Sequence, residues 1–236
     1  SVTGNPVVAD VVDIRDRASV EALAGRHTVD IVVNNAGGQF PQRARDFSPN
    51  GWRSVIDLDL NGTWTMTQVF GNRMLDGDGG SIVQIVALVG RGMPGIAHSA
   101  AARAGVVELS RTLAYEWGPA VRINCVAPGA FHTDAWEATY DPRVGADMSG
   151  VPLPYPGRPS DVANAVVFLA SPAAAYVTGA CLFVDGGHSL HGTISALPAD
   201  GYPERDLPAV HRSPDRPASG DERSSPPQHT QPDRSP

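Results

Sequence analysis

Short apolar runs alternate with longer stretches of helical periodicity from residue 6 to residue 190. The runs are rich in Val and Ile, which favour β-strands, and the stretches between them are long enough for helices. Parallel strands require such crossover connections, so the pattern predicts an α/β domain with a parallel sheet. The runs are continuously apolar, which favours strands covered by helices on both faces, as in a doubly wound Rossmann-type sheet.

The predicted elements follow from these runs and from their flanking turn residues. Strands are expected at Val7–Val12, Val29–Val33, Ser81–Val86, Arg122–Val126 and Cys181–Val184, and helices near Ala18–Ala24, Gly51–Met74, Ala97–Trp117 and Ser160–Ala170. Residues 1–192 are expected to form one domain. Residues 193–236 are rich in Pro, Ser and charged residues, which predicts a disordered tail, with a proline-rich docking peptide as the alternative.

Composition excludes several classes of function. A net charge of -7 without a basic stripe argues against a nucleic-acid partner. No apolar run approaches the length of a membrane span and no leader pattern is visible, which favours a cytoplasmic protein. All 18 basic residues are arginine, so lysine chemistry such as Schiff-base catalysis is excluded. Cys125 and Cys181 are expected to be free thiols, and His188 and His191 lack a third ligand, so no metal is predicted.

One strand runs directly into Asn34-Asn35-Ala36-Gly37-Gly38, whose small residues would let a flat ligand approach the backbone. Open α/β sheets bind ligands at this carboxyl end of their strands. Alone, the motif could be an ordinary turn. It is followed at regular intervals by Gly80-Ser81-Ile82-Val83, by residues 100–106 (AAARAGV), by residues 122–129 (RINCVAPG), by Thr178-Gly179 and by Val184-Asp185-Gly186-Gly187.

This ordered set resembles the short-chain dehydrogenase/reductase family over residues 6 to 190. Within that family the chain is most similar to enoyl-CoA reductases, such as peroxisomal trans-2-enoyl-CoA reductase, and to the 2,4-dienoyl-CoA reductases. The similarity rests on Asn34–Phe40, on Ala97–Gly105 and on Glu116-Trp117.

The resemblance implies a nicotinamide cofactor, NADP or NAD, and a set of residues that would hold it. Asp13 and Ile14 would meet the adenine, Asn35, Ala36 and Gly37 the adenosine side, and Pro128, Gly129, Phe131 and Thr133 the nicotinamide, with residues 132–158 as a substrate lid. Asp13 could instead be a solvated or helix-capping carboxylate. The residue that would select NAD or NADP follows a strand that this sequence lacks.

The sequence departs from the family pattern at its beginning. The glycine-rich turn that grips the pyrophosphate is absent, since Thr3-Gly4 is followed by Asn5-Pro6, and two strands of the family's sheet are missing. The chain is then expected to be either a fragment with coding sequence upstream or a relic that binds dinucleotide poorly. The apolar edge of strand 29–33 would be bare.

The proton-transfer residues differ as well. Ser99 stands at the place of the family's tyrosine, Arg103 at that of its lysine, Asp59 at that of its asparagine, and Ala87 or Val86 at that of its serine. Arginine can clamp a ribose and supply positive charge, whereas a serine hydroxyl is too weak an acid to donate a proton near neutral pH. His98 is therefore the candidate proton donor, unless it is a surface or capping histidine.

Two functions of different class remain. The first is an NAD(P)-dependent oxidoreductase that transfers hydride to or from an enoyl-CoA-like or other carbonyl-conjugated small molecule, with Ser99, Arg103 and His98 as the catalytic residues. The second is a catalytically inactive relative that serves as an interaction or regulatory protein, or a truncated gene product. A homodimer or homotetramer is expected by analogy with the family.

Overall fold

The computed structural model describes residues 6–88, 94–131, 133 and 151–190. Within these residues four strands form a parallel sheet in the order β1-β2-β3-β4. The strands are β1 (Ile31–Asn34), β2 (Gly80–Ile85), β3 (Val121–Pro128) and β4 (Cys181–Val184), and the α-helices are α1 (Arg17–Arg26), α2 (Pro49–Ile56), α3 (Thr63–Leu75), α4 (Ala97–Trp117) and α6 (Pro159–Ala170). A π-helical turn occupies Asp57–Gly62, and short 3-10 turns lie at Ala44–Asp46, Pro172–Ala174 and His188–Leu190.

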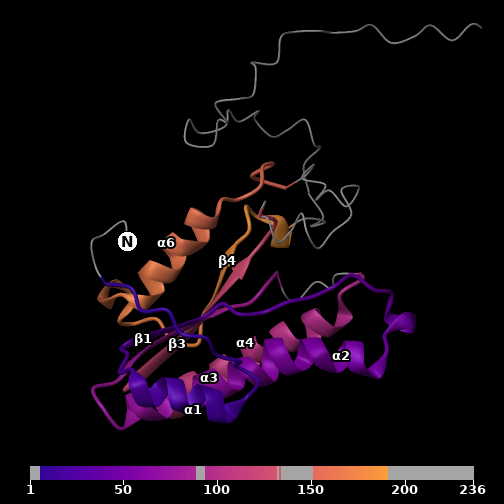
Figure 1. The fold of residues 1–236 in the computed structure, drawn as a ribbon. Coiled ribbons are helices and arrows are strands. Elements are labelled where there is room, and N and C mark those ends of the chain that lie inside the picture. Colours follow the sequence, from indigo (N-terminus) through magenta and orange to yellow (C-terminus); the bar gives the residue numbers. More distant parts are fainter. Residues whose placement is uncertain (1–5, 89–93, 132, 134–150, 191–236) are drawn as a thin grey trace, which may run out of the picture. The chain divides into compact units, whose positions relative to one another are not determined.

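Helices cover both faces of this sheet, as Figure 1 shows: α6 lies on one face and α1 to α4 lie on the other. Ile82 and Ile123 belong to the core cluster on the α3 and α4 side. Val83 and Val126, the next residues along the same strands, pack with Leu169 of α6. Consecutive side chains of a strand point to opposite faces, so the continuous apolar runs fill two cores at once. The predicted doubly wound α/β fold is confirmed.

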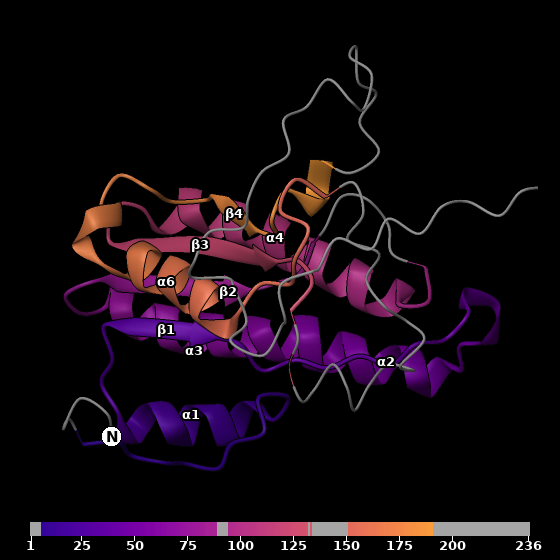
Figure 2. The ribbon, with the colours of Figure 1, turned by 90° about the horizontal axis from the view of Figure 1, so that it is seen from above.

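The sheet ends at β1 on one side, as Figure 2 shows. Ile31 and Val33 of this edge strand are 49% and 44% exposed, whereas Ile82 and Ile123 in the central strands are fully buried. Among the residues that the structure describes, no strand pairs with this apolar edge, which is the edge that the sequence predicted to be bare.

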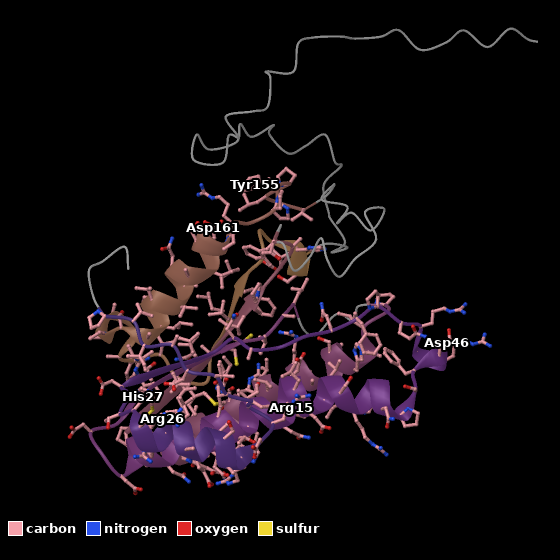
Figure 3. All side chains as sticks on the ribbon, in the orientation of Figure 1. Arg15, Arg26, His27, Asp46, Tyr155 and Asp161 are labelled. Atoms are coloured by element: carbon pink, nitrogen blue, oxygen red, sulfur yellow. The ribbon has the colours of Figure 1, made fainter. Side chains whose placement is uncertain are left out.

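The predicted strand Val7–Val12 is wrong, because these residues pair with no strand among those the structure describes. Val7, Val8 and Val11 are 79%, 72% and 100% exposed. The segment is held instead by Asp10, which pairs with Arg26 and His27 at the end of α1 (Figure 3). β-propensity alone does not make a strand, because the backbone needs a neighbour to bond with.

The prediction of one continuous helix over Gly51–Met74 is also wrong, because the helix is interrupted. The structure divides it into α2, the π-helical turn and α3. In that turn a Cβ on Gly62 would lie 2.7 Å from Ile14 Cγ1, so a glycine is needed where the turn packs on the loop before α1. Periodicity does not reveal a π-turn, because the apolar spacing on either side of it remains helical.

The remaining bounds agree closely with prediction. α4 and β4 begin and end where expected, and the other predicted strands and helices differ by a few residues at their ends. Cys125 and Cys181 lie opposite each other on β3 and β4 as free thiols, and burial raises the pKa of Cys125 to about 12. In the part of the chain that is described, no helix has both the length and the apolar character needed to span a bilayer. The predicted tail and most of the predicted lid lie outside the described residues.

Candidate active site

The first two turns of α4 carry Ser99 and Arg103 on one helix face. Ser99 is fully buried, and the Arg103 side chain is 17% exposed. Their i, i+4 spacing places them together, and Arg103 Nε donates a hydrogen bond to Ser99 Oγ over 3.0 Å. The structure thus joins two of the three predicted catalytic residues directly.

The Arg103 guanidinium is held at three points. Besides Ser99, Arg103 Nη1 donates to the Val86 carbonyl oxygen over 2.8 Å, just beyond the end of β2. Arg103 Nη2 lies 3.3 Å from Asp59 Oδ2. A planar guanidinium with donors in a fixed fork can satisfy three such partners, which an ammonium group cannot do with the same geometry. The cation is therefore fixed in place at the carboxyl end of the sheet.

Asp59 is the acidic partner, and it projects from the π-helical turn. The residue is only 4% exposed, and its Oδ1 accepts a hydrogen bond from the Gly38 backbone N–H over 2.8 Å. Burial raises the pKa of Asp59, and this effect outweighs the opposing charge of Arg103. π-turns occur often at functional sites, since they redirect one side chain out of helical register. From the sequence, Asp59 was expected at the place of the family's asparagine, and no function was predicted for it.

The predicted cofactor loop begins where β1 ends. Asn34 Nδ2 donates to Gln84 Oε1 over 2.8 Å and to Thr67 Oγ1 over 3.1 Å, and Gln84 Nε2 donates to the same Thr67 oxygen over 2.8 Å. All three residues are buried, so this closed network anchors the end of β1 and the loop that follows it.

Gly37 in that loop lies against the charged pair. A Cβ at this position would be 3.1 Å from Asp59 Oδ1 and 3.2 Å from Arg103 Nη2. Gly37 therefore meets Asp59 and Arg103 with no side chain to separate them, whereas Asn35 and Ala36 are exposed. The structure brings one predicted cofactor residue, Gly37, and one predicted catalytic residue, Arg103, into contact.

His98 lies beside this group but is buried completely. Its ring contacts those of Phe40 and Phe47, with centroids 4.7 Å and 4.5 Å away. Its Nδ1 accepts a hydrogen bond from the Ser99 backbone N–H over 2.7 Å. Burial lowers the pKa of His98, so its neutral form is favoured. His98 is the second residue of α4, whose N-cap is Ile96, and the role of His98 as a proton donor stays a prediction.

Gln39 is a site residue that sequence reasoning quoted only as part of a motif. The Ser99 hydroxyl donates to Gln39 Oε1 over 2.6 Å. Gln39 directly follows the Asn34–Gly38 loop, and that loop lies at the ligand-binding end of the sheet. This position could have indicated from the sequence that Gln39 belongs to the site.

The predicted nicotinamide loop follows β3. The Gly129 N–H donates to the Val184 carbonyl oxygen over 3.0 Å, and a Cβ on Gly129 would lie 2.7 Å from Asp185 Cα. Phe131 forms an isolated parallel bridge with Gly157. Gly129 is thus held by the end of β4 and the turn after it, whereas Phe131 is held by Gly157 in the segment before α6, and Thr133 is an exposed residue beyond them.

Asp13 and Ile14 lie in the loop before α1. Both Asp13 carboxylate oxygens accept hydrogen bonds from the Arg15 guanidinium, at 2.9 Å and 2.7 Å, and Figure 3 labels this arginine. The hydrogen bonds with Arg15 lower the pKa of Asp13 to about 2. Ile14 is buried against Gly62. Neither contact joins Asp13 to the group around Asp59.

Comparison with known proteins agrees with this arrangement. Residues 3–189 match the family model described as enoyl-(acyl carrier protein) reductase. A 3-oxoacyl-(acyl-carrier-protein) reductase FabG of Chlamydia muridarum is 38% identical, with 78% of this chain and 77% of that protein covered. A peroxisomal 2,4-dienoyl-CoA reductase of Danio rerio is 37% identical, with 79% and 66% covered.

A solved structure shares the fold as well. The crystal structure of a short chain dehydrogenase from Bacillus anthracis has a TM-score of 0.70 and 35% identity, over 78% of this chain and 76% of that one. The family model, the relatives and the solved structure place the same α/β domain in one family of oxidoreductases. The chain belongs to the short-chain dehydrogenase/reductase family.

Proposed function

We propose that this chain reduces the carbon–carbon double bond of an α,β-unsaturated acyl thioester of the acyl-CoA type, with hydride from NADPH or NADH. The observation that carries the proposal is the group of Asp59, Ser99 and Arg103, of which Asp59 and Ser99 are buried, at the positions where the resemblance places the family's proton-transfer residues. The names of two relatives, a 3-oxoacyl-(acyl-carrier-protein) reductase and a 2,4-dienoyl-CoA reductase, support an acyl thioester substrate.

The chemistry of the group favours an enoyl over a keto substrate. Reduction of a ketone leaves a strongly basic alkoxide oxygen, which needs an acid beside it, and Ser99 is too weak an acid for this task. Reduction of an enoyl thioester places hydride on the β-carbon and an electron pair on the thioester oxygen, and the proton goes to the α-carbon. A fixed hydroxyl and a guanidinium stabilise such an oxygen without losing a proton themselves.

Asp59 is the group that holds the proton for the α-carbon. Its pKa is raised by burial, so its acid form persists to higher pH than that of an ordinary aspartate. The Arg103 cation, 3.3 Å from Asp59 Oδ2, then stabilises the carboxylate that remains after transfer. His98, which the sequence suggested for this role, is buried and accepts a hydrogen bond from the Ser99 backbone N–H.

The described residues around Gly37 and Arg103 fit the ribose part of a nicotinamide dinucleotide. The Gly37 backbone reaches the Asp59–Arg103 pair where a side chain would block it. Two of the five guanidinium N–H groups of Arg103 donate to Ser99 and to the Val86 carbonyl oxygen, and the contact with Asp59 is an ion pair at 3.3 Å. N–H groups on Nη1 and Nη2 therefore remain for ribose hydroxyls. The other residues proposed to line the cofactor are Asp13, Ile14, Asn35, Ala36, Gly37, Pro128, Gly129, Phe131 and Thr133. When bound, the cofactor supplies the hydride.

The test is to compare an enoyl thioester with a 3-oxoacyl thioester of equal chain length, using NADPH and NADH in parallel and absorbance at 340 nm. We expect kcat/KM for the enoyl substrate to exceed that for the keto substrate by at least about tenfold, since in this proposal the substrate oxygen faces Ser99, which cannot protonate an alkoxide, and the Asp59 proton goes to the α-carbon. Equal or faster turnover of the keto substrate would refute the proposal.

A catalytically inactive interaction protein is the second candidate. It is favoured by the exposed apolar edge of the sheet, where Ile31 and Val33 are about half exposed, and by the exposed Val7, Val8 and Val11. The two candidates differ in whether the chain binds a dinucleotide at all.

A further inference from the structure

The loop between β1 and α2 is tied to the candidate active site at two points. Phe40 and Phe47 both pack on the ring of His98, with centroids 4.7 Å and 4.5 Å away. His98 directly precedes Ser99, the residue that faces the substrate oxygen in the proposed function. The residues between Phe40 and Phe47 are therefore held close to the reacting end of the substrate.

The middle of this loop, residues 41–46, forms a turn that closes on itself. The Asp46 N–H donates to the Arg43 carbonyl oxygen over 2.9 Å, and Gln42 Nε2 donates to the Asp46 carbonyl oxygen over 3.3 Å. The Gln42 N–H donates to the Gly95 carbonyl oxygen over 2.7 Å, which fixes the turn to the segment before α4. Figure 3 labels Asp46 on this turn, which projects beyond α2 on the right of the view. A ligand would not have to order the turn on binding.

Two arginine side chains extend from the turn into solvent. Those of Arg43 and Arg45 are 79% and 81% exposed. Their Nε atoms lie 2.8 Å and 3.7 Å from the two carboxylate oxygens of Asp46, which stands between them. In the part of the chain that is described, the Nη groups of both arginines make no hydrogen bond. The turn therefore presents two guanidinium groups against one carboxylate, with their terminal N–H donors available.

The position of these cations suits the phosphate groups of a coenzyme A thioester. Arg43 is three residues from Phe40 and Arg45 is two residues from Phe47, so their Cα atoms lie within about 11 Å and about 7 Å of residues that contact His98. Coenzyme A carries its phosphates at the far end of the long pantetheine arm, away from the reacting carbons. Guanidinium groups bind phosphate oxygens through paired N–H donors, which makes arginine the suitable residue for such a site.

We propose that Arg43 and Arg45 form a phosphate-binding site for coenzyme A, which favours CoA thioesters over thioesters without the nucleotide. The inference rests on the proposed function, since it takes the thioester to lie at Ser99.

An acidic acyl carrier protein is the other acyl carrier with negative charge. A protein partner would need a broad complementary surface, whereas two adjacent guanidinium groups match a single phosphate or diphosphate. Residues 39–56 hold three arginines and one aspartate, but the whole chain has a net charge of -7, which repels an acidic protein. The charge distribution therefore favours coenzyme A.

The test compares one enoyl group carried either on coenzyme A or on pantetheine, which has no phosphate. Arg43→Ala/Arg45→Ala should raise the KM for the CoA thioester by about tenfold, because charge-assisted hydrogen bonds are lost. It should leave kcat, the KM for the pantetheine thioester and the KM for the nicotinamide cofactor unchanged.

Arg73→Ala/Arg111→Ala is the matched control, because it removes the same charge from exposed positions in the C-terminal halves of α3 and α4. Arg111 has an i, i+3 acidic partner, Glu108, as Arg43 has in Asp46. The KM for the CoA thioester should be that of the wild type in this control.

Four results would overturn the proposal. They are an unchanged KM for the CoA thioester in Arg43→Ala/Arg45→Ala, an equal rise for both thioesters, a raised KM for NADPH or NADH, and a loss seen only with the enoyl group on an acyl carrier protein. The second would assign the arginines to the shape of the loop, the third to the cofactor and the fourth to a protein partner.

A second measurement does not depend on turnover. In isothermal titration with coenzyme A itself, Arg43→Ala/Arg45→Ala should raise Kd by about tenfold, and added salt should weaken binding to the wild type because exposed charges are screened. The same Kd in both proteins, or no binding by the wild type at millimolar concentration, would overturn the proposal. Failure of the wild-type chain to reduce any enoyl thioester would refute the proposed function instead, and the titration would still decide the phosphate site.

Discussion

Three residues that differ from the family pattern, Ser99, Arg103 and Asp59, contact one another in the structure. Their differences compensate one another, which is not visible when each position is compared with the family pattern separately. A serine is shorter than a tyrosine, and the longer, forked arginine compensates by reaching it with Nε while Nη2 reaches Asp59. The chain contains no lysine, so arginine is the only cation with constant charge that could fill this place. The three substitutions therefore act as one set.

Asp59→Asn tests the proton-holding role. Because burial raises the pKa of Asp59, the acid form is present below that pKa and is lost as the pH rises through it. The enoyl reduction rate should therefore fall on the alkaline side. Asp59→Asn should lower kcat by about 10²-fold and abolish this alkaline fall, as measured by initial rates across pH.

Asp57→Asn provides the matched control, because Asp57 lies on the same π-helical turn, is exposed and accepts a hydrogen bond from Asn61. Its kcat and pH profile should match those of the wild type. A wild-type pH profile retained in Asp59→Asn would assign the proton to another group.

At the level of elements, the break between α2 and α3 is what delivers Asp59 to the site. The helical spacing of the sequence predicts one continuous helix here, and the structure inserts the π-turn Asp57–Gly62. The turn places Asp59 against Gly38 and leaves Gly62 packed on Ile14. The loop after β1, the π-helical turn and α4 thus meet at Asp59, although they are far apart in the sequence.

The contact between α3 and α4 depends on Gly71. A Cβ there would lie 2.2 Å from Trp117 Cζ3, far inside contact distance. Gly71→Ala should therefore destabilise the fold by about 1–3 kcal/mol through overpacking, as measured by urea unfolding.

Gly25→Ala in α1 is the control, because a Cβ at that position meets nothing within 4 Å. It should stabilise the fold by about 0.5–1 kcal/mol through lower backbone entropy in the unfolded chain. Equal effects of the two substitutions would contradict the close packing of α3 on α4.

For the molecule as a whole, dinucleotide binding separates the two candidate functions. The chain spans about three quarters of the FabG relative, and β1 is the edge strand of the sheet among the described residues. Titration with NADPH and NADH, followed by nicotinamide fluorescence, should show saturable binding below about millimolar concentration if the chain works as an enzyme. Arg103→Ala should weaken that binding, since it removes the proposed ribose contact. No binding of either cofactor at millimolar concentration would favour the interaction protein.

Much of the fold could be predicted because it depends on local patterns. The run Ser81–Val86 became β2 within one residue, and Ala97–Trp117 became α4 without change, since apolar spacing along the chain reports burial directly. Val7–Val12 is similarly rich in valine but formed no strand, because strand formation depends on a partner that local pattern does not supply.

The candidate site was predictable only in part. Ser99 and Arg103 are four residues apart on one helix, so their contact follows from helix geometry. Asp59 and Gln39 lie 40 and 60 residues before Ser99, and only the π-turn and the loop after β1 bring them to it.

By itself, then, the sequence determined the α/β class, the family, and the residue types available for chemistry, including the absence of lysine. The tertiary structure decided which of those residues touch and in what state. It buried His98 among aromatic rings, raised the pKa of Asp59, and set the direction of the Ser99 hydroxyl. Burial and hydrogen-bond direction depend on groups that are distant in the chain and close in space, and periodicity carries no record of them.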